Sequence, residues 1–399
     1  MTTGQQPRTY PFGEADRLRL HPTYAELRRS EPVTRVRLPH GGDGWLATRY
    51  TDVRTVLSDP RFSRAATVGA DVPRTTPLVS RDTNILTMDP PDHTRLRKLV
   101  AKAFTARRTE MLRPRAEKIV GDLLDAVEAQ GPPVDLIEAL ALPLPITLIC
   151  EMLGVPVEDR VDFRRWSDKA LALTAFAPEE IVAAVEDLRD YIAGLVAQRR
   201  EHPTDDVLGT LVQARDEGDR LTEAELVNFG VTLLVAGHET TANQIGNFVY
   251  TLLTEPEHLA ALRTTPDLVP AAVEELLRIV PLGGAAGFAR IATEDVEIGG
   301  VTVPAGDAVL VSMPSANRDD AVFTHPELID FRRETNPHIA FGHGVHHCVG
   351  AQLARMELQV ALSALLQRFP ALELAAPVEE IVFKKGRLVR GLASLPVRW

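Results

Sequence analysis

The alternation of apolar and polar residues along the chain predicts a protein built mainly of helices. Apolar residues recur every three or four positions through most of residues 89–280, and again over residues 348–369, as the buried face of a helix requires. No linker of biased composition interrupts the 399 residues. We therefore expect one domain, residues 1–399, of the mainly α class with small β-sheets. Strands are expected where apolar and polar residues alternate singly, mainly at residues 33–48, 294–312 and 382–399.

The longest predicted helix begins at a capping box, Thr222-Glu223-Ala224-Glu225, and runs apolar on nearly every side to Leu253. A helix of this kind is expected at the centre of its fold. Its middle holds Gly237, Glu239 and Thr240, although an internal glycine costs about 1 kcal/mol and an unpartnered buried carboxylate costs more. Either Gly237 allows close packing and Glu239 meets a partner, or these residues form a functional site.

A second unusual stretch, Phe341 to Gly350, places glycines, histidines and one cysteine before another predicted helix. Gly342 and Gly344 permit backbone conformations that other residues avoid, and a helix N-terminus favours the thiolate form of a nearby cysteine. Cys348 is therefore a candidate metal ligand or nucleophile. Three interpretations are open: an inert buried cysteine, a zinc or copper site that also uses the neighbouring histidines, and a heme with an axial thiolate.

Composition and charge narrow the function classes. The net charge of −11 disfavours nucleic acid as a partner, and the polar residues 1–8 resemble neither a signal peptide nor a membrane anchor. Hydrophobic residues make up 45% of the chain and charged residues 25%, as in soluble globular proteins. The two cysteines, Cys150 and Cys348, lie far apart in the sequence, which favours a reducing cytoplasm over a disulfide framework. Cys150 lies in an apolar run and is expected in the core.

The stretch Phe341-Gly342-x-Gly-x-His346-x-Cys348-x-Gly350 resembles the heme-binding signature of the cytochrome P450 superfamily. Further motifs in the expected order extend the resemblance over essentially the whole chain, and the closest likeness is to the soluble bacterial, actinobacterial-type monooxygenases of secondary metabolism. The resemblance implies a cytochrome P450-like fold that holds heme b between the long central helix and a helix that begins at Cys348. The Cys348 thiolate would be the axial ligand of the iron.

The resemblance also implies which residues bind the heme propionates. His93 and Arg97 stand four apart on one predicted helix face and match propionate-binding positions in related bacterial proteins. Arg290 and His346 match two more such positions. An arginine or histidine that faces a carboxylate forms a charge-assisted pair.

The middle of the central helix matches the oxygen-binding segment of the family. Ala236 and Gly237 would line the heme, with Gly237 leaving space over the iron. Thr240 is expected to bond back to a carbonyl one turn earlier. Glu239 and Thr240 match the acid–alcohol pair that relays protons during dioxygen activation.

A third group of residues is expected to be structural. Glu275 and Arg278 stand three apart on a predicted helix and match the buried Glu-x-x-Arg of the family, for which Arg333 would be the third member. These residues would hold the loop that presents Cys348. Residues 171–180, a loop-like interruption between helices, would lie over the substrate pocket as a lid. His238, His338 and His347 receive no role.

The implied activity is a monooxygenase that inserts one oxygen atom from O2 into a hydrophobic substrate. The resemblance points to hydroxylation or epoxidation of a macrolide or other polyketide in antibiotic biosynthesis, by a cytoplasmic monomer. The chain has no reductase motif, so a ferredoxin and a ferredoxin reductase would supply electrons, with the ferredoxin docking on a basic patch of Lys98, Lys102, Arg107, Arg108 and Arg355. Alternatives are a terpenoid, steroid or peptide substrate, peroxide-driven oxidation, and a heme-binding protein without turnover.

Overall fold

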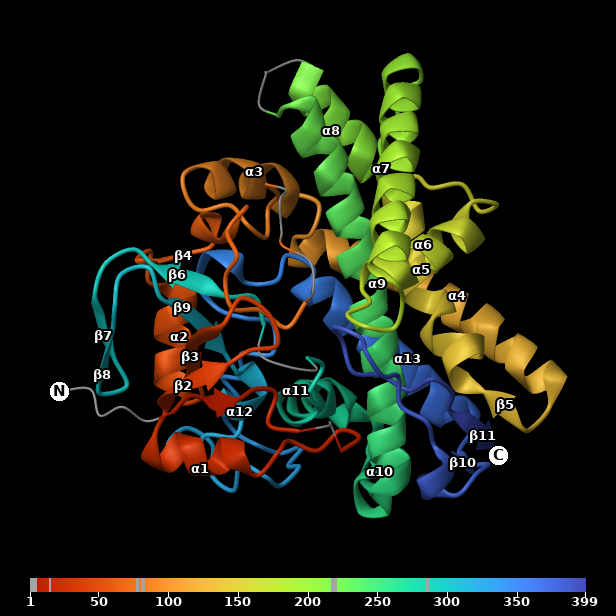
Figure 1. Cartoon of the computed structure of the whole chain (residues 1–399). Coiled ribbons are helices and arrows are strands. Elements are labelled where there is room, and N and C mark those ends of the chain that lie inside the picture. Colours follow the sequence, from red (N-terminus) through yellow and green to blue (C-terminus); the bar gives the residue numbers. More distant parts are fainter. Residues whose placement is uncertain (1–5, 14–15, 77–78, 80–82, 217–220, 284–286) are drawn as a thin grey trace. The chain divides into compact units, whose positions relative to one another are not determined.

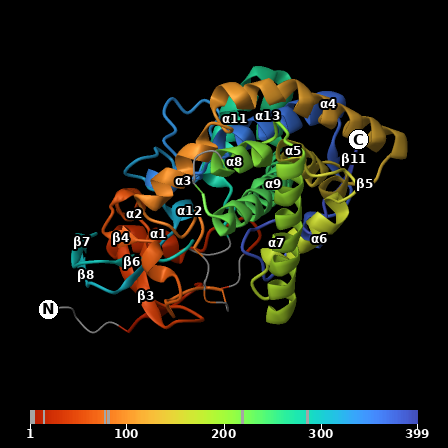
Figure 2. The same cartoon turned by 90° about the horizontal axis from the view of Figure 1, so that it is seen from above.

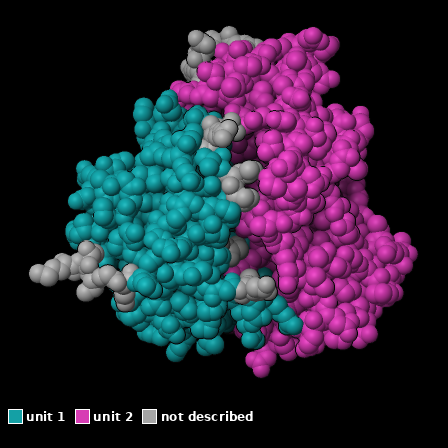
Figure 3. Space-filling view, in the orientation of Figure 1, with its two compact units in different colours: residues 1–94, 277–329, 334–348 teal, residues 95–276, 330–333, 349–399 magenta. Residues whose placement is uncertain are grey.

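The computed structural model describes residues 6–13, 16–76, 79, 83–216, 221–283 and 287–399. The chain forms two compact units (Figure 3). Unit 1 comprises residues 1–94, 277–329 and 334–348, and unit 2 comprises residues 95–276, 330–333 and 349–399. Helices dominate and the sheets are small, which confirms the predicted fold class. The organisation as one domain over residues 1–399 stays a prediction.

Unit 1 is built on a sheet of six described strands in the order β1-β2-β3-β9-β6-β4 (Figure 1). The strands predicted at residues 33–48 are present and form a hairpin, with Val33 opposite Ala47 in an antiparallel pair. The sheet joins distant parts of the sequence, because β3 pairs in parallel with β9. The strands are β1 (Arg8–Thr9), β2 (Val33–Arg37), β3 (Asp43–Ala47), β4 (Phe62–Ser63), β6 (Arg290–Ala292) and β9 (Ala308–Val311), and β7 (Val296–Ile298) and β8 (Val301–Val303) form a separate ribbon.

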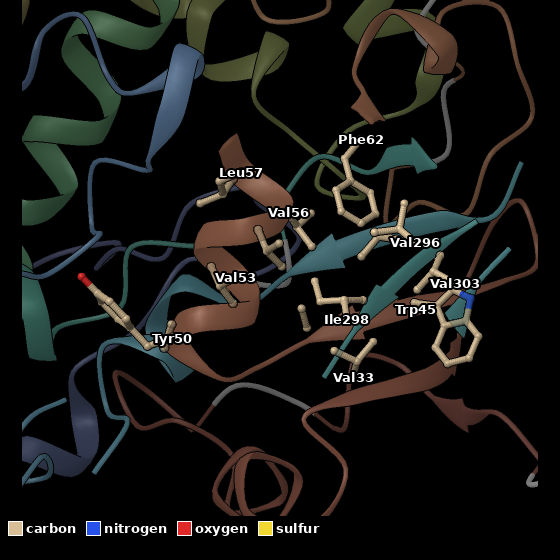
Figure 4. Packing of buried hydrophobic residues seen from close by; sticks show 14 of the residues in the cluster. Val33, Trp45, Tyr50, Val53, Val56, Leu57, Phe62, Val296, Ile298 and Val303 are labelled. Atoms are coloured by element: carbon tan, nitrogen blue, oxygen red, sulfur yellow. The ribbon is translucent and has the colours of Figure 1, made fainter. Parts of the chain in front are cut away.

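The core of unit 1 lies between this sheet, the β7–β8 ribbon and helix α2 (Tyr50–Ser58) (Figure 4). Val53 and Val56 stand one turn apart on α2 and are fully buried, as are Val296 and Val303 of the ribbon. Each such side chain contributes about 1.5–3 kcal/mol when it leaves water. The remaining helices within unit 1 are α1 (Thr23–Ser30), α12 (Met313–Ala316), and the short 3-10 helices η1 (Ala65–Thr67) and η4 (Gly344–His346).

Unit 2 is organised around α9 (Glu223–Thr254), the long helix that the sequence predicts. Its capping box is present: Glu225 N–H donates to Thr222 Oγ1 at 3.1 Å, and Thr222 N–H donates to the Glu225 carboxylate at 2.8 Å. Helices α5 (Pro143–Leu153), α7 (Pro178–Glu201) and α13 (Ala351–Arg368) pack against α9. Figure 2 shows α13 running beside α4 (Ala106–Gln130).

The other elements of unit 2 are short. Helices α3 (Asp92–Ala101) and α11 (Val269–Ile279) each contain residues of both units. A small antiparallel sheet has the strand order β10-β11-β5. The remaining elements are α6 (Arg160–Ala170), α8 (Val207–Asp216), α10 (Pro256–Thr264), η2 (Ile137–Ala141, a π-helix), η3 (Pro266–Leu268), η5 (Val378–Glu380), β5 (Val134–Asp135), β10 (Glu373–Leu374) and β11 (Pro396–Arg398).

The prediction of strands over residues 382–399 is only partly right. The regular strand there is β11, and residues 382–393 form a loose hairpin with one bridge, Phe383 to Leu392. The physical reason is that the hairpin's backbone bonds to another segment: Leu388 N–H donates to Leu171 O at 3.2 Å, which leaves fewer groups for a ladder. Among the described helices, none has the length and apolar character needed to cross a membrane.

Candidate functional site

The loop of unit 1 that ends at Cys348 leaves this cysteine exposed. Cys348 N–H donates to Phe341 O at 2.9 Å, which closes the loop. Gly344 has a φ of 71°, and a Cβ there would lie 2.5 Å from Leu57 O, so the site requires glycine. The inert buried interpretation is therefore wrong for Cys348. It holds for Cys150, which is fully buried and whose pKa burial raises to about 12.

The expectation that a helix begins at Cys348 needs a correction. Helix α13 begins at Ala351, with Gly350 as the residue before its first turn. Residues 349–350 form a turn instead, so Cys348 lies three residues ahead of the helix. The predicted end of the helix is correct, since α13 ends at Arg368 ahead of Pro370.

Unit 1 also contains a cluster of buried and half-buried basic side chains that includes three of the predicted propionate ligands, His93, Arg290 and the half-buried His346. The rings of His93 and His346 lie 4.4 Å apart between centroids, and Arg290 is 6% exposed. Burial, together with His93, Arg290 and Arg64, lowers the pKa of His346 to about 3. Burial likewise lowers the pKa of Arg290 to about 10. A bound anion would therefore stabilise the charged forms of the basic groups in this cluster.

Arg64 belongs to this cluster, and the sequence analysis missed it. Its side chain is 5% exposed and donates to two backbone carbonyls, from Nε to Leu86 O at 2.9 Å and from an Nη to Ala289 O at 2.5 Å. Burial and the neighbouring Arg290 lower its pKa to about 9. Nothing in the sequence distinguishes Arg64 from the other arginines of its segment, because its burial depends on residues more than 200 positions away.

Arg97, the fourth predicted propionate ligand, lies one turn after His93 on α3 and is half-buried. His93 belongs to unit 1 and Arg97 to unit 2. The two residues share one helix, as the spacing predicts. Their role as ligands stays a prediction.

This cluster and the Cys348 loop fit a heme. Nε2 of His346 is buried and has no hydrogen-bond partner among the described residues. Arg290 forms no ion pair with a carboxylate in the described part of the chain. A buried cation and a buried ring nitrogen without a hydrogen bond both cost folding free energy unless a ligand pairs with them. Two carboxylates would supply that charge and those hydrogen bonds. The exposed Cys348 thiol supplies the ligand type that a heme-thiolate iron requires.

The zinc or copper interpretation finds no support in the described residues. Among them, no group of three or more histidine, cysteine, aspartate or glutamate side chains is placed to hold a metal ion. His343 lies beside Arg54, with 3.4 Å between Arg54 Nε and His343 Nε2. His347 is exposed, and His338 Nδ1 accepts a bond from Ala340 N–H at 3.3 Å.

In unit 2, the middle of α9 carries the predicted acid–alcohol pair. Thr240 Oγ1 donates to Ala236 O at 2.9 Å, which is the expected bond to a carbonyl one turn earlier. Glu239 is 6% exposed. A Cβ on Gly237 would lie 3.0 Å from Ile149 Cγ1, so this glycine lets α9 approach α5 closely. The space over the iron that the resemblance assigns to Gly237 stays a prediction.

The buried Glu239 carboxylate has two partners that the sequence analysis did not name. Lys384 Nζ and Asn243 Nδ2 both donate to Glu239 Oε1, at 3.1 Å and 2.9 Å. Burial opposes the charge, yet Lys384 and His238 hold the pKa of Glu239 below its ordinary value. Asn243 could have been found, because it stands four residues after Glu239 on one helix face. Lys384 lies 145 positions away and gave no signal.

His238 is a packing residue. Its ring lies edge-on to Phe163 of α6, with 5.2 Å between centroids, and its Nδ1 lies 2.9 Å from Leu234 O. Burial lowers its pKa. The side chain therefore ties α9 to α6 beside the acid–alcohol pair.

The predicted structural residues form buried polar contacts. Arg333 Nε lies 3.2 Å from Glu275 Oε2, and Glu275 also accepts from Asp330 N–H at 2.9 Å. Arg278 is 1% exposed, and its guanidinium donates to the backbone carbonyls of residues 317, 326 and 328. These bonds fix an irregular segment that precedes the Cys348 loop in the sequence. Whether they serve that loop stays a prediction.

Residues 20–388 match the family model described as Cytochrome P450. The chain is 56% identical to nocardicin C N-oxygenase of Nocardia uniformis subsp. tsuyamanensis and 50% identical to mycinamicin IV hydroxylase/epoxidase of Micromonospora griseorubida, with complete coverage of both chains in each case. The crystal structure of the LnmA cytochrome P450 hydroxylase, from the leinamycin biosynthetic pathway of Streptomyces atroolivaceus S-140, is 56% identical. Its TM-score is 0.93, and the match covers 98% of this chain and 100% of that one.

Proposed function

We propose, from the premise that the chain belongs to the cytochrome P450 family, that it oxidises a macrolide or related polyketide by hydroxylation or epoxidation. The chain is a P450 monooxygenase with a heme-thiolate iron cofactor. The single observation that supports the substrate class is its 50% identity, over the full length, to mycinamicin IV hydroxylase/epoxidase. The product would be an oxygenated antibiotic or its precursor.

The cofactor we propose is heme b, with Cys348 as the iron ligand. When bound, the heme supplies the activation of dioxygen. His93, Arg97, Arg290 and His346 would hold its propionates. Ala236, Gly237, Phe341, Gly342 and Gly350 would line it. We add Arg64 to the residues that would hold the propionates. It is buried beside Arg290 and donates only to backbone carbonyls among the described residues.

The protein's own catalytic work is to hold and move protons. The Glu239 carboxylate is charged and fixed by two donors, so it can receive a proton that water carries in from the solvent and pass it on to an acceptor. Thr240 Oγ1 holds the next position along α9 and is tied to Ala236 O. We assign the catalytic proton relay to these two residues. Glu275, Arg278 and Arg333 would be structural and hold the loop that presents Cys348.

The redox partner and the organisation of the chain complete the proposal. P450 enzymes of this family act with a substrate, O2 and redox partners. For this chain we propose a ferredoxin with a ferredoxin reductase, a monomeric state, a cytoplasmic location, and one P450 domain spanning residues 1–399. Lys98, Lys102, Arg107 and Arg108 are exposed and suit an acidic ferredoxin. Arg355 is engaged by Glu274 at 2.7 Å and contributes less.

The test begins with the absorption spectrum of the reduced protein under carbon monoxide. A Soret band shifted far to the red is expected for the wild type, and Cys348→Ala should lose it. Mycinamicin IV and other macrolides are then screened for spin-state shifts and for oxygenated products with a ferredoxin and its reductase. Thr240→Ala should keep the spectrum but divert electrons to hydrogen peroxide. A wild type that neither binds nor oxidises any macrolide would overturn the proposed substrate class.

A second candidate is the oxygenation of a nitrogen atom of the substrate. It is favoured by the 56% identity to nocardicin C N-oxygenase over the whole of both chains. Nocardicin C belongs in the same screen as mycinamicin IV, under identical conditions. Turnover of nocardicin C alone would replace the macrolide proposal. Heme binding without product from either compound would overturn both substrate proposals.

A further inference from the structure

The hairpin at the C-terminal end of unit 2, residues 382–393, has no part in the proposed function so far. We call it the C-terminal hairpin. Its arms are joined by bonds from Lys384 N–H to Gly391 O and from Ala393 N–H to Val382 O, both 2.8 Å long. Its tip turns at Gly386, which has a φ of 64°. Two other segments of unit 2 contact this hairpin at different places.

The first contact is with the relay carboxylate. Lys384 extends from one arm of the hairpin, and its Nζ lies 3.1 Å from Glu239 Oε1 and 3.3 Å from Asn243 Oδ1. The side chains of Lys384 and Glu239 are 17% and 8% exposed. A charge-assisted bond between groups this buried is strong and geometrically fixed. Lys384 therefore determines where the Glu239 carboxylate lies.

The hairpin cannot shift freely along α9. A Cβ on Gly391 would lie 1.7 Å from Asn243 Oδ1, so the hairpin backbone rests directly on this side chain. Asn247 Nδ2, one turn further along α9, donates to Arg390 O at 3.1 Å. The arm opposite Lys384 is thus anchored on the same face of α9 that carries Glu239.

The second contact is at the hairpin tip. The lid predicted over residues 171–180 is non-helical only at residues 171–177, between α6 and α7, because α7 already begins at Pro178; we call residues 171–177 the lid segment. Leu173 and Thr174 both donate their backbone N–H groups to Gly386 O, at 2.8 Å and 3.0 Å. Arg387 binds Asp168 at the end of α6. The Arg387 guanidinium also lies 4.9 Å from the centroid of the Phe176 ring.

We propose that Lys384 is a positioning residue for Glu239 and that the C-terminal hairpin transmits the position of the lid segment to it. The proposal rests on the proposed function, in which Glu239 belongs to the proton relay, and on the expectation that the lid segment covers the substrate. When the lid segment is docked on Gly386 and Arg387, the hairpin is fixed at both ends and Lys384 holds the carboxylate. When the lid segment leaves, the tip is released and the relay loses its fixed geometry. Protons are then delivered only while the lid segment covers a substrate.

Such an arrangement has a direct chemical benefit. A monooxygenase that delivers protons without a bound substrate consumes reductant and releases peroxide. Tying the carboxylate to the lid segment restricts proton delivery to the closed enzyme. The charged and titratable groups that act on Glu239 are Lys384 from the hairpin, His238 from α9 and Arg164 from α6, so removing Lys384 leaves the other two in place.

The first experiment tests the positioning role in the ferric holoenzyme. Infrared difference spectra against Glu239→Gln follow the protonation of this carboxyl as the pH is lowered. Lys384→Met and Lys384→Gln should move the titration to higher pH, because the strongest favourable charge is lost, and Lys384→Arg should restore it. The exposed neighbour Lys385→Met is the matched control and should titrate like the wild type. An unchanged titration in both neutral variants would overturn the positioning role.

The second experiment tests the transmission. Arg387→Ala should speed hydrogen–deuterium exchange in the lid segment and raise the pH at which Glu239 titrates. It should also lower product formed per NADPH roughly three- to thirtyfold, the range of couplings carried through packed contacts. In the Lys384→Met background the same substitution should speed exchange without any further effect on the carboxyl or on product yield. If Arg387→Ala lowered the product yield by the same factor with and without Lys384→Met, the hairpin would not transmit the position of the lid segment to Glu239.

These readouts separate this proposal from the proposed function. The infrared and exchange measurements need no substrate, and each variant is compared only if it keeps the carbon monoxide spectrum of the wild type. A wild type that oxidises no macrolide but shows the expected titrations would defeat the substrate class and leave Lys384 as a positioning residue. Normal macrolide turnover with unchanged titrations would support the substrate class and overturn the positioning role of Lys384.

Discussion

Glu357 offers a sharp test of how burial controls charge in this protein. The side chain lies on α13 and is 1% exposed. Neither carboxylate oxygen has a hydrogen-bond partner among the described residues. Burial alone raises its pKa to about 8, so we expect the protonated, neutral acid in the folded protein at neutral pH.

The linkage between this pKa and stability has a definite sign. Below about pH 4.5 the group is protonated in both the folded and the unfolded chain, and it adds no pH dependence. Between about pH 4.5 and 8 the folded chain holds one proton more than the unfolded chain, so stability falls by about 1.4 kcal/mol per pH unit. Between pH 5 and 7.5 this amounts to about 3 kcal/mol. Above about pH 8 the contribution is constant.

The perturbation is Glu357→Gln, which keeps the shape of the side chain and removes its titration. Between pH 5 and 7.5 the wild type should lose about 3 kcal/mol of unfolding free energy through the titration of Glu357. The variant should not show this loss. Relative to the wild type, the variant should therefore be about 3 kcal/mol more stable at pH 7.5 than at pH 5. Urea unfolding followed by circular dichroism at the two pH values measures it. Glu117→Gln, an exposed position on α4, is the control. Parallel pH profiles for wild type and Glu357→Gln would refute the reasoning.

Three further outcomes are expected. Arg333→Ala should lower the unfolding free energy by about 3–5 kcal/mol, because it breaks the buried ion pair with Glu275; a loss below about 1 kcal/mol in urea unfolding would contradict this. Thr222→Ala removes the acceptor of the Glu225 N–H at the start of α9 and should cost about 1 kcal/mol, which Thr222→Ser should recover in the same assay. Arg290→Ala should speed the transfer of heme to apomyoglobin, and an unchanged transfer rate would remove Arg290 from the propionate set.

Local sequence patterns were enough for most of the fold and for the turn and cap that lie beside the candidate site residues. The apolar periodicity placed α9, and Thr222 and Glu225 marked its first turn, because capping is a contact between residues three apart. Gly344 signalled a tight loop before Cys348, since a positive φ is a local property. The limits of local reasoning appear at residues 349–350, where a turn delays the start of α13. They appear again at residues 382–393, where bonds to a distant loop replace a strand ladder.

The sequence by itself determined the chemistry available to this protein: a cysteine ahead of a helix, and an acid and an alcohol in the middle of a buried one. Only the tertiary structure decided what surrounds them. Lys384 reaches Glu239 from 145 positions away, and Arg64 enters the basic cluster through contacts with residues far along the chain. The physical reason is that charge state and orientation depend on burial and on partners, and both arise from packing between distant segments rather than from the order of neighbouring residues.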